Sequence, residues 1–254
     1  MVFFLKAYGI TDCGLVRRQN QDAYRILNKD NALCGVVCDG MGGAKAGNVA
    51  SELAVKLFTG AMNLMQDEEP GKVMMDALGL ANREVWRRSM NDPDCTGMGT
   101  TLVAAYLSDP NHAYVLNVGD SRAYQISPNS GIHQISRDHS LVAEMVARGK
   151  ITPEEARTHP NKNIITRALG TEENTVGDLF EVDLQEDEFI LLCSDGLSNQ
   201  VTEEEMLDEV LHGGDLESCC QRLLDIALRR GAPDNVTIVI ISAGDGVLNR
   251  EMED

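Results

Sequence analysis

Three aspartates stand at the edges of strand-like apolar runs that lie far apart in the chain. In chain order these are Leu33 to Cys38 with Asp39, Phe189 to Cys193 with Asp195, and Val236 to Ile241 with Asp234. A carboxylate at the edge of an apolar core is costly unless a cation or several hydrogen-bond donors meet it. Any one Asp-Gly or Asp-Asn pair is also an ordinary turn dipeptide. Because the pattern occurs three times, each time near the end of an expected strand, the sequence predicts a shared metal site.

Composition and charge narrow the class of protein. The chain has 254 residues, 43% of them hydrophobic, and no Pro/Ser-rich linker, which predicts one large domain over residues 1–245 and an acidic tail at 246–254. The net charge of −18 argues against nucleic acid or an anionic membrane as a partner. The seven cysteines lack zinc-site spacing and are interpreted as buried thiols. No signal segment or membrane span is recognised, so we expect a cytoplasmic protein.

The apolar pattern predicts a sheet-rich fold with helices. Strands are expected at 3–8, 23–26, 33–38, 101–106, 112–118, 122–127, 132–135, 180–182, 189–193 and 236–242. Short turns separate the central strands, which favours antiparallel hairpins. Helices at 47–65 and 72–90 should cover a sheet, and two more begin near Thr202 and Asp215. The expected buried faces of the first two helices carry Val49, Leu53, Leu57, Ala61 and Leu64, and Met74, Leu78, Ala81 and Val85.

The segment 140–167 breaks this run of strands. It contains a short helix ending near Gly149, a second start signal at Thr152 to Glu155, and a polar stretch around His159. By pattern alone, such an insertion either packs on a sheet edge or forms a lid over a site.

The candidate ligands are all hard oxygen donors, which favours Mg²⁺ or Mn²⁺ over zinc or copper. A carboxylate that bridges two such ions can hold a water for attack on phosphorus. Arg17 and Arg18 are the nearest candidates to bind phosphate, although such a pair is also typical of a solvated surface. Three other catalytic classes are excluded because their motifs are absent: the cysteine-based phosphatase loop, the Walker nucleotide loop and the Gly-x-Ser-x-Gly elbow.

Seven motifs occur in the order seen in bacterial metal-dependent protein phosphatases of the type-2C (PPM) family, which the chain resembles over nearly its whole length. The motifs are Arg17-x-x-Asn20-Gln21-Asp22, Asp39-Gly40-Met41-Gly42-Gly43, Gly97-Met98-Gly99-Thr100-Thr101, Asn117-Val118-Gly119-Asp120-Ser121-Arg122, Asp138-His139-Ser140, Ser194-Asp195-Gly196 and Asp234-Asn235-Val236-Thr237. The resemblance implies an α+β fold, with a central β-sandwich of two antiparallel sheets, helices on both outer faces and a helical flap at about 140–167. It also implies hydrolysis of phosphoserine and phosphothreonine in proteins by a metal-bridging water.

The same resemblance assigns roles to individual residues. Asp39 would bridge two metal ions, Asp195 and Asp234 would complete the first, and the Gly40 carbonyl would bind the second. Asp22 would orient waters on the second ion, and Arg17 would bind the substrate phosphate. Asp120, with Asp195, resembles the family's weaker third-metal site. The cofactors implied are two Mn²⁺ or Mg²⁺ ions with a weak third.

Two positions depart from the family pattern. Met41 stands where many members have a histidine proposed as general acid, which leaves His139 or a metal-bound water as candidates for that role. Gln21 stands where others often have glutamate, which leaves Asp22 as the support of the second ion. We expect signalling partners, namely phosphorylated proteins modified by a cognate Ser/Thr kinase. The alternatives left open are a phosphoprotein-binding pseudophosphatase and a small-molecule phosphoesterase on the same fold.

Overall fold

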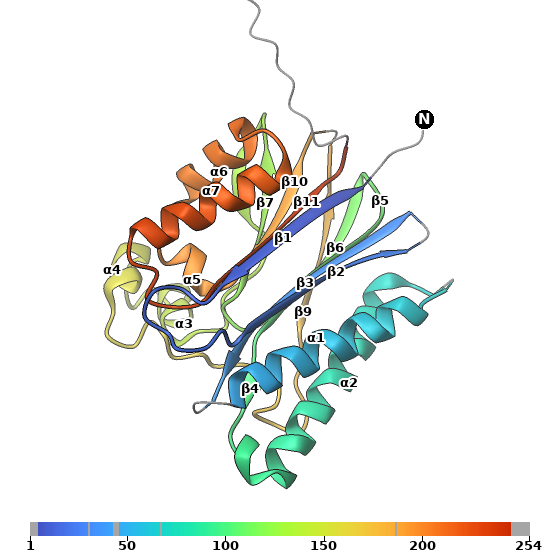
Figure 1. The fold of residues 1–254 in the computed structure, drawn as a ribbon, viewed down its shortest axis with the longest axis vertical. Helices are drawn as coiled ribbons and strands as arrows, with labels where there is room; N and C mark the ends of the chain where they lie inside the picture. The colour runs from blue at the N-terminus through green and yellow to red at the C-terminus, as the bar shows by residue number, and fades with distance from the viewer. Residues whose placement is uncertain (1–4, 30, 43–45, 67, 186, 245–254) are drawn as a thin grey trace, which may run out of the picture.

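The computed structural model describes residues 5–29, 31–42, 46–66, 68–185 and 187–244, and it shows two antiparallel sheets packed face to face (Figure 1). One sheet has the order β1-β11-β10-β7-β8, from β1 (Lys6–Asp12), β11 (Val236–Ser242), β10 (Phe189–Cys193), β7 (Arg122–Ser127) and β8 (Gly131–Gln134). The other has the order β2-β3-β5-β6-β9, from β2 (Asp22–Lys29), β3 (Ala32–Met41), β5 (Leu102–Asp109), β6 (His112–Val118) and β9 (Asp178–Asp183). The short β4 (Gly99–Thr100) pairs with the end of β3.

Helices cover both outer faces, as the family resemblance implied. On one side, α1 (Ala46–Leu64) and α2 (Pro70–Asn91) pack against the sheet that contains β3, and α6 (Glu203–His212) and α7 (Leu216–Arg229) pack against the other sheet (Figure 1). Strand residues therefore alternate between two apolar environments. In β11, Ile238 and Ile240 pack beneath the helices, whereas Val239 and Ile241 pack between the sheets. Burial on both faces explains why β11 is a continuous apolar run.

The predicted buried helix face is right for α2 and only partly right for α1. Met74, Leu78, Ala81 and Val85 are all buried. In α1 the fully buried positions are instead Ala50, Ala54, Phe58 and Met62, while Leu64 is 77% exposed. Small alanines on the inner face bring the helix close to β2 and β3, and the larger Val49, Leu53 and Leu57 lie at its margin, where they are only partly buried.

Smaller differences concern element ends. The first strand begins at Lys6 and continues to Asp12, and residues 3 and 4 of the predicted strand lie outside the described part. The acidic tail at 246–254 also lies outside it. The start signals are confirmed, since the Thr152 and Thr202 side chains each cap a helix in a reciprocal capping box and Asp215 caps α7. All seven cysteines are free thiols, and all but Cys13 are buried.

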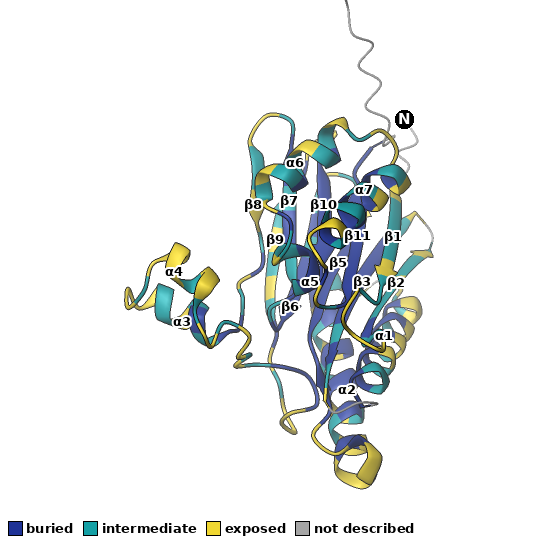
Figure 2. Cartoon of the chain, turned by 60° about the vertical axis from the view of Figure 1, so that its left-hand side comes forward, coloured by how far each residue is buried: buried dark blue, intermediate teal, exposed yellow. Residues whose placement is uncertain are grey.

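The segment 140–167 stands out from the sandwich and carries α3 (Leu141–Ala147) and α4 (Pro153–Thr158) (Figure 2). Its base is closed by an antiparallel bridge between Ser140 and Ile165, with the Leu141 N–H donating to the Ile164 carbonyl and the Thr166 N–H donating to the His139 carbonyl. Along the described residues, no helix is long and apolar enough to cross a membrane.

Candidate active site

Asp22 and Asp39 lie directly opposite each other on the antiparallel strands β2 and β3. Side chains paired in this way point to the same face, and two like charges so placed are destabilising. Burial raises the pKa of Asp22 to about 7. The pKa of Asp39 is raised well above its ordinary value, first by burial and then by the charge of Asp22. The pair therefore forms a place where a cation would relieve repulsion.

Asp195 and Asp234 reach the same region from the other sheet. The strands β10 and β11 are antiparallel neighbours, and Asp195 begins the short helix α5 (Asp195–Ser198) just after β10, while Asp234 stands just before β11. The two chain segments approach each other very closely here. A Cβ atom on Gly196 would lie 1.8 Å from the Asn235 carbonyl oxygen, so only glycine fits.

Five carboxylates are brought into one electrostatic neighbourhood. After burial, the causes that raise the pKa of Asp39 are the charges of Asp22, Asp195, Asp120 and Asp234. The pKa of Asp120 is itself raised to about 7, by burial and then by the charges of Asp195 and Asp138. The structure thus gathers every carboxylate that the sequence singled out. Because these buried carboxylates repel one another, they are stable together only when positive charge lies beside them.

Backbone contacts fix the position of Asp39 and Gly40. The Asp39 N–H donates to the Thr101 hydroxyl at 2.9 Å, and the Asp39 carbonyl accepts from the Thr101 N–H and from the Thr100 hydroxyl, both at 2.9 Å. The Gly40 N–H donates to the Gln21 carbonyl at 3.1 Å. The threonine pair was noted in the sequence without a role, and the structure shows that it holds the strand end that carries Asp39.

Arg17 lies beside the carboxylates on the exposed loop between β1 and β2. Its Nη2 is 2.7 Å from Oδ2 of Asp234, and this hydrogen bond is the main reason why the pKa of Arg17 is raised. The charges of Asp39 and Asp195 act in the same direction. Arg17 is therefore an exposed residue, but its guanidinium is held at the edge of the carboxylate cluster by Asp234.

His139 is buried, and both of its ring nitrogens are engaged. Nδ1 accepts the Gly119 N–H at 3.1 Å. Nε2 lies 3.2 Å from the Asp178 carboxylate and 3.1 Å from Nη1 of Arg167. Burial lowers the pKa of His139, which keeps the ring neutral. These contacts leave His139 holding the turn before Asp120 and the base of the flap. They argue against the candidate role of His139 as general acid.

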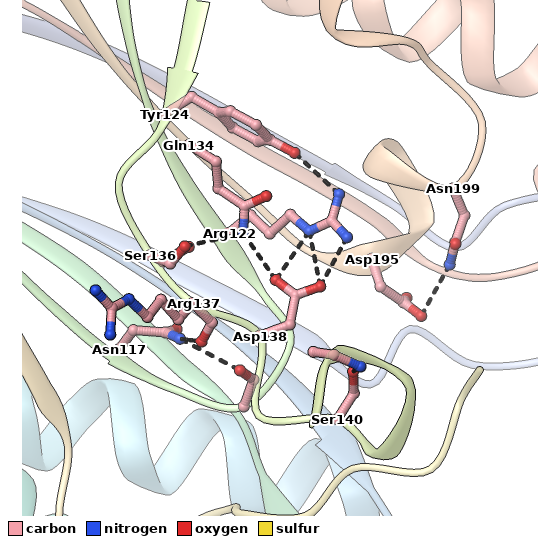
Figure 3. Close-up of polar contacts among 12 residues, drawn as sticks. Asn117, Arg122, Tyr124, Gln134, Ser136, Arg137, Asp138, Ser140, Asp195 and Asn199 are labelled. Carbon is pink, nitrogen blue, oxygen red and sulfur yellow. Dashed lines mark hydrogen bonds and ion pairs between the residues drawn. The ribbon is translucent and has the colours of Figure 1, made fainter. Parts of the chain in front are cut away.

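A cavity of about 850 Å³ extends from Asp120 and Asp195 to the inner side of α3 and α4. Figure 3 shows its polar wall, where the Arg122 guanidinium donates to both carboxylate oxygens of Asp138. Arg122 also donates to the Tyr124 hydroxyl, and the Gln134 amide donates to Asp138. The flap supplies most of the apolar lining and also Lys162. The charge of Lys162 lowers the pKa of Asp195, against the effect of burial. Space and positive charge are thus available next to the carboxylates.

Comparisons with known proteins agree with this geometry. A family model described as protein phosphatase 2C matches residues 16–228. The chain belongs to the protein phosphatase 2C family. The serine/threonine phosphatase Stp of Listeria monocytogenes is 39% identical to it over 236 residues, which is 91% of this chain and 93% of that protein.

Solved structures of family members superpose closely. Stp1 from Staphylococcus aureus has a TM-score of 0.88 and 37% identity, covering 94% of this chain and 95% of its own. The catalytic domain of PstP, solved in complex with two manganese ions, has a TM-score of 0.83 and 32% identity, covering 95% and 99%. The αββα arrangement predicted by resemblance is therefore confirmed.

The carboxylates of this protein phosphatase 2C member fit divalent ions. Oδ1 of Asp22 and Oδ1 of Asp195 are buried without a hydrogen-bond partner among the described residues, and both are hard donors. Across the same residues, no group of three His, Cys, Asp or Glu side chains lies in an arrangement that could hold a metal ion by itself. Mg²⁺-like ions usually keep several waters and take one or two carboxylates, so this cluster is of the kind that holds hydrated ions.

Several residues with clear structural roles were in the quoted motifs but received no function from the sequence. Asn235 donates to the carbonyls of Cys13 and Gln19 and accepts from the Gln21 N–H, which ties the Arg17 loop to β11. Ser194 and Thr237 both contact Asp22. A hydroxyl or amide close to an aspartate is the available signal. Its partner is far away in the sequence, however, since Ser194 and Asp22 are 172 positions apart.

Proposed function

We propose that this chain hydrolyses phosphoserine and phosphothreonine in proteins, with two Mn²⁺ or Mg²⁺ ions held around Asp39 and a weaker third near Asp120. The single observation that carries the proposal is the convergence of Asp22, Asp39, Asp195 and Asp234 from two sheets beside Arg17. Membership of the protein phosphatase 2C family supports it. When bound, such ions supply Lewis acidity that activates water and neutralises charge on the phosphoryl group.

The residues of the chain itself would hold the ions and bind the substrate. Asp39 would be shared by two ions, one of them also held by Asp195 and Asp234. The other would be held by the Gly40 carbonyl, with Asp22 supporting it. Arg17 binds phosphoryl oxygens, because a guanidinium matches two of them at once. To do so it gives up its contact with Asp234. The flap cavity accommodates residues that flank the phosphorylated side chain.

The proposed setting follows from the same features. The proposed partners are phosphoproteins modified by a cognate kinase, and the proposed location is the cytoplasm. Neither nucleic acid nor a membrane is bound, because the chain carries a net charge of −18. A pseudophosphatase is disfavoured because all the carboxylates are present and gathered. A small-molecule phosphoesterase is distinguished by testing sugar phosphates beside a phosphothreonine peptide.

The deciding experiment measures phosphate release from a phosphothreonine peptide with and without Mn²⁺. We expect no turnover in EDTA and full turnover on adding Mn²⁺. Asp39→Asn should lose more than the roughly 10–100-fold typical of residues that only support a metal ligand. Asp76→Asn, on the exposed side of α2, is the matched control and should behave like the wild type. Full activity without metal, or calorimetric Mn²⁺ binding unchanged in Asp39→Asn, would overturn the proposal.

A further inference from the structure

Asp22 is held on one side only. It is 8% exposed, and its Oδ2 accepts hydrogen bonds from the Ser194 hydroxyl at 2.7 Å and the Thr237 hydroxyl at 2.6 Å. Its Oδ1 is equally buried and has no partner among the described residues. If the hydrogen bonds served only to compensate burial of the carboxylate, we would expect donors at both of its oxygens. Here both donors meet the same oxygen.

The direction of these hydrogen bonds is fixed by a longer chain of donors. The Thr237 hydroxyl donates its single proton to Oδ2 of Asp22 and has no second proton to give. The Thr11 hydroxyl, 2.7 Å from Thr237, must then donate to Thr237, and the Asn20 amide donates to Thr11 at 2.8 Å. The sequence of donors runs from Asn20 through Thr11 and Thr237 to Asp22. Such chains polarise and strengthen one another.

The second hydroxyl is equally constrained. The Ser194 oxygen accepts the Thr237 N–H at 3.0 Å, and its proton is therefore directed to Asp22. The Ser194 N–H in turn donates to the Thr237 carbonyl at 3.1 Å. The Ser194 hydroxyl is thus fixed by the backbone of β11, and the Thr237 hydroxyl by the hydroxyl of Thr11.

These hydroxyls come from the segments that carry two other candidate ligands. Ser194 precedes Asp195, and Thr237 follows Asp234 by three residues on β11. Asp22 begins β2 in the opposite sheet. The contacts therefore join the metal-ligand ends of one sheet to the carboxylate of the other.

We propose that Ser194 and Thr237 are positioning residues, which hold Asp22 in one orientation and leave its Oδ1 available to a divalent cation or to that ion's water. This inference rests on the proposed function, because it concerns the same metal centre. It goes further in assigning a role in metal binding to two hydroxyls that are not themselves ligands.

The test uses a matched pair at one position. Thr237→Val keeps the shape of the side chain and removes the hydroxyl, while Thr237→Ser keeps the hydroxyl. Mn²⁺ affinity is measured by titration calorimetry on the full chain, and melting temperature is measured with EDTA and with Mn²⁺. We expect Thr237→Val to bind one ion about 10–100-fold more weakly, the loss typical of an outer partner of a metal ligand, and Thr237→Ser to restore the affinity.

Two further variants complete the design. Ser194→Ala removes the other hydroxyl from the same oxygen and carries the test if Thr237→Val does not fold. Thr11→Val acts one step further along the donor chain and should weaken binding less than Thr237→Val. A purely structural role would lower the melting temperature in EDTA but leave Mn²⁺ affinity unchanged, and that result would overturn the inference.

Failure of the proposed function gives a different result. In that case the wild type itself would bind no Mn²⁺ and release no phosphate. If the wild type binds Mn²⁺ and turns over, while Thr237→Val and Ser194→Ala titrate like the wild type, the proposed function stands and the positioning role is wrong.

Discussion

The guanidinium of Arg17 lies 2.7 Å from a carboxylate oxygen of Asp234, so the group proposed to bind phosphate contacts a group proposed to bind metal. Both side chains are partly exposed, at 53% and 33%. Such a pair is worth little on its own and can be exchanged for a better partner at small cost. The two proposed roles, phosphate binding by Arg17 and metal binding by Asp234, are therefore compatible with each other.

Arg17→Ala should impair use of phosphopeptide without preventing metal binding. A hydrogen bond to a charged group is worth about 1.5–3 kcal/mol, so kcat/KM should fall by about 10- to 100-fold. Calorimetric Mn²⁺ binding should persist, because Asp234 keeps its carboxylate. The neighbouring Arg18→Ala is the control and should keep kcat/KM close to that of the wild type. Equal losses in the two variants would remove the specific role of Arg17.

Asp120→Ala should keep the fold and the two more tightly bound ions but lose most turnover. Asp120 stands in the turn held by Asn117 and His139. The charges of Asp195 and then Asp138 act on it. An ion held by so few protein ligands is mostly hydrated and weakly bound, so the defect should be larger at low Mn²⁺ than at high Mn²⁺. Phosphopeptide rates across a Mn²⁺ titration check this. Wild-type rates throughout would make Asp120 a turn residue only.

Shortening the flap within 141–164 should alter the choice of protein substrate more than the hydrolysis of a small aryl phosphate. The segment is closed at its base by the Ser140 and Ile165 bridge, and its helices line the cavity rather than the carboxylate pairs. Rates on two phosphopeptides and on an aryl phosphate, with circular dichroism as the folding control, measure the effect. Equal loss on all substrates in a folded variant would exclude a lid role.

How much of the fold and of the site could be predicted depends on how far apart in the sequence the interacting residues lie. The strands β6, β7, β10 and β11 have the predicted bounds, because alternating or continuous apolar runs and turn dipeptides are local signals. The three aspartates at strand ends were likewise legible in the sequence. The partners of those aspartates were not, since the hydroxyls on Asp22 come from residues 172 and 215 positions away. The predicted face of α1 lies at the margin of the buried face, because the small alanines, rather than the larger apolar residues, lie closest to the sheet.

Glu205→Gln should destabilise the protein at neutral pH and less at acid pH. Hydrogen bonds from Arg230, then from the Thr202 N–H, lower the pKa of Glu205 to about 2. A lowered folded-state pKa stabilises above the unfolded value of 4.5, and this stabilisation is lost as the pH falls from 4.5 toward 2. Denaturant midpoints at several pH values should show a deficit of about 1 kcal/mol at pH 7 that narrows below pH 4.5.

Glu52→Gln, on the exposed side of α1, serves as the control for this series. It should leave the midpoint close to that of the wild type at every pH. A Glu205→Gln deficit that stayed constant down to the acid limit would show that charge at this position does not contribute.

Iodoacetamide should label the native protein at Cys13 alone. The other six thiols are buried, and burial raises the pKa of Cys34 and Cys193 to about 12, so they present neither access nor thiolate at pH 8. Mass spectrometry should show one adduct, and Cys13→Ser should show none. Because the proposed chemistry uses no thiol, Cys13→Ser should hydrolyse an aryl phosphate at the wild-type rate. Several adducts on folded protein would contradict the burial of these thiols.

The close approach of the backbone at Gly196 limits how far the spacing of the proposed metal ligands can vary. A single methyl group there would meet the Asn235 carbonyl and push the end of β10 away from the start of β11. The separation of Asp195 and Asp234 is thus fixed by an absent side chain, which no change of rotamer can compensate. Gly196→Ala would test the precision that the ions require, because it keeps every ligand and alters only the spacing between them.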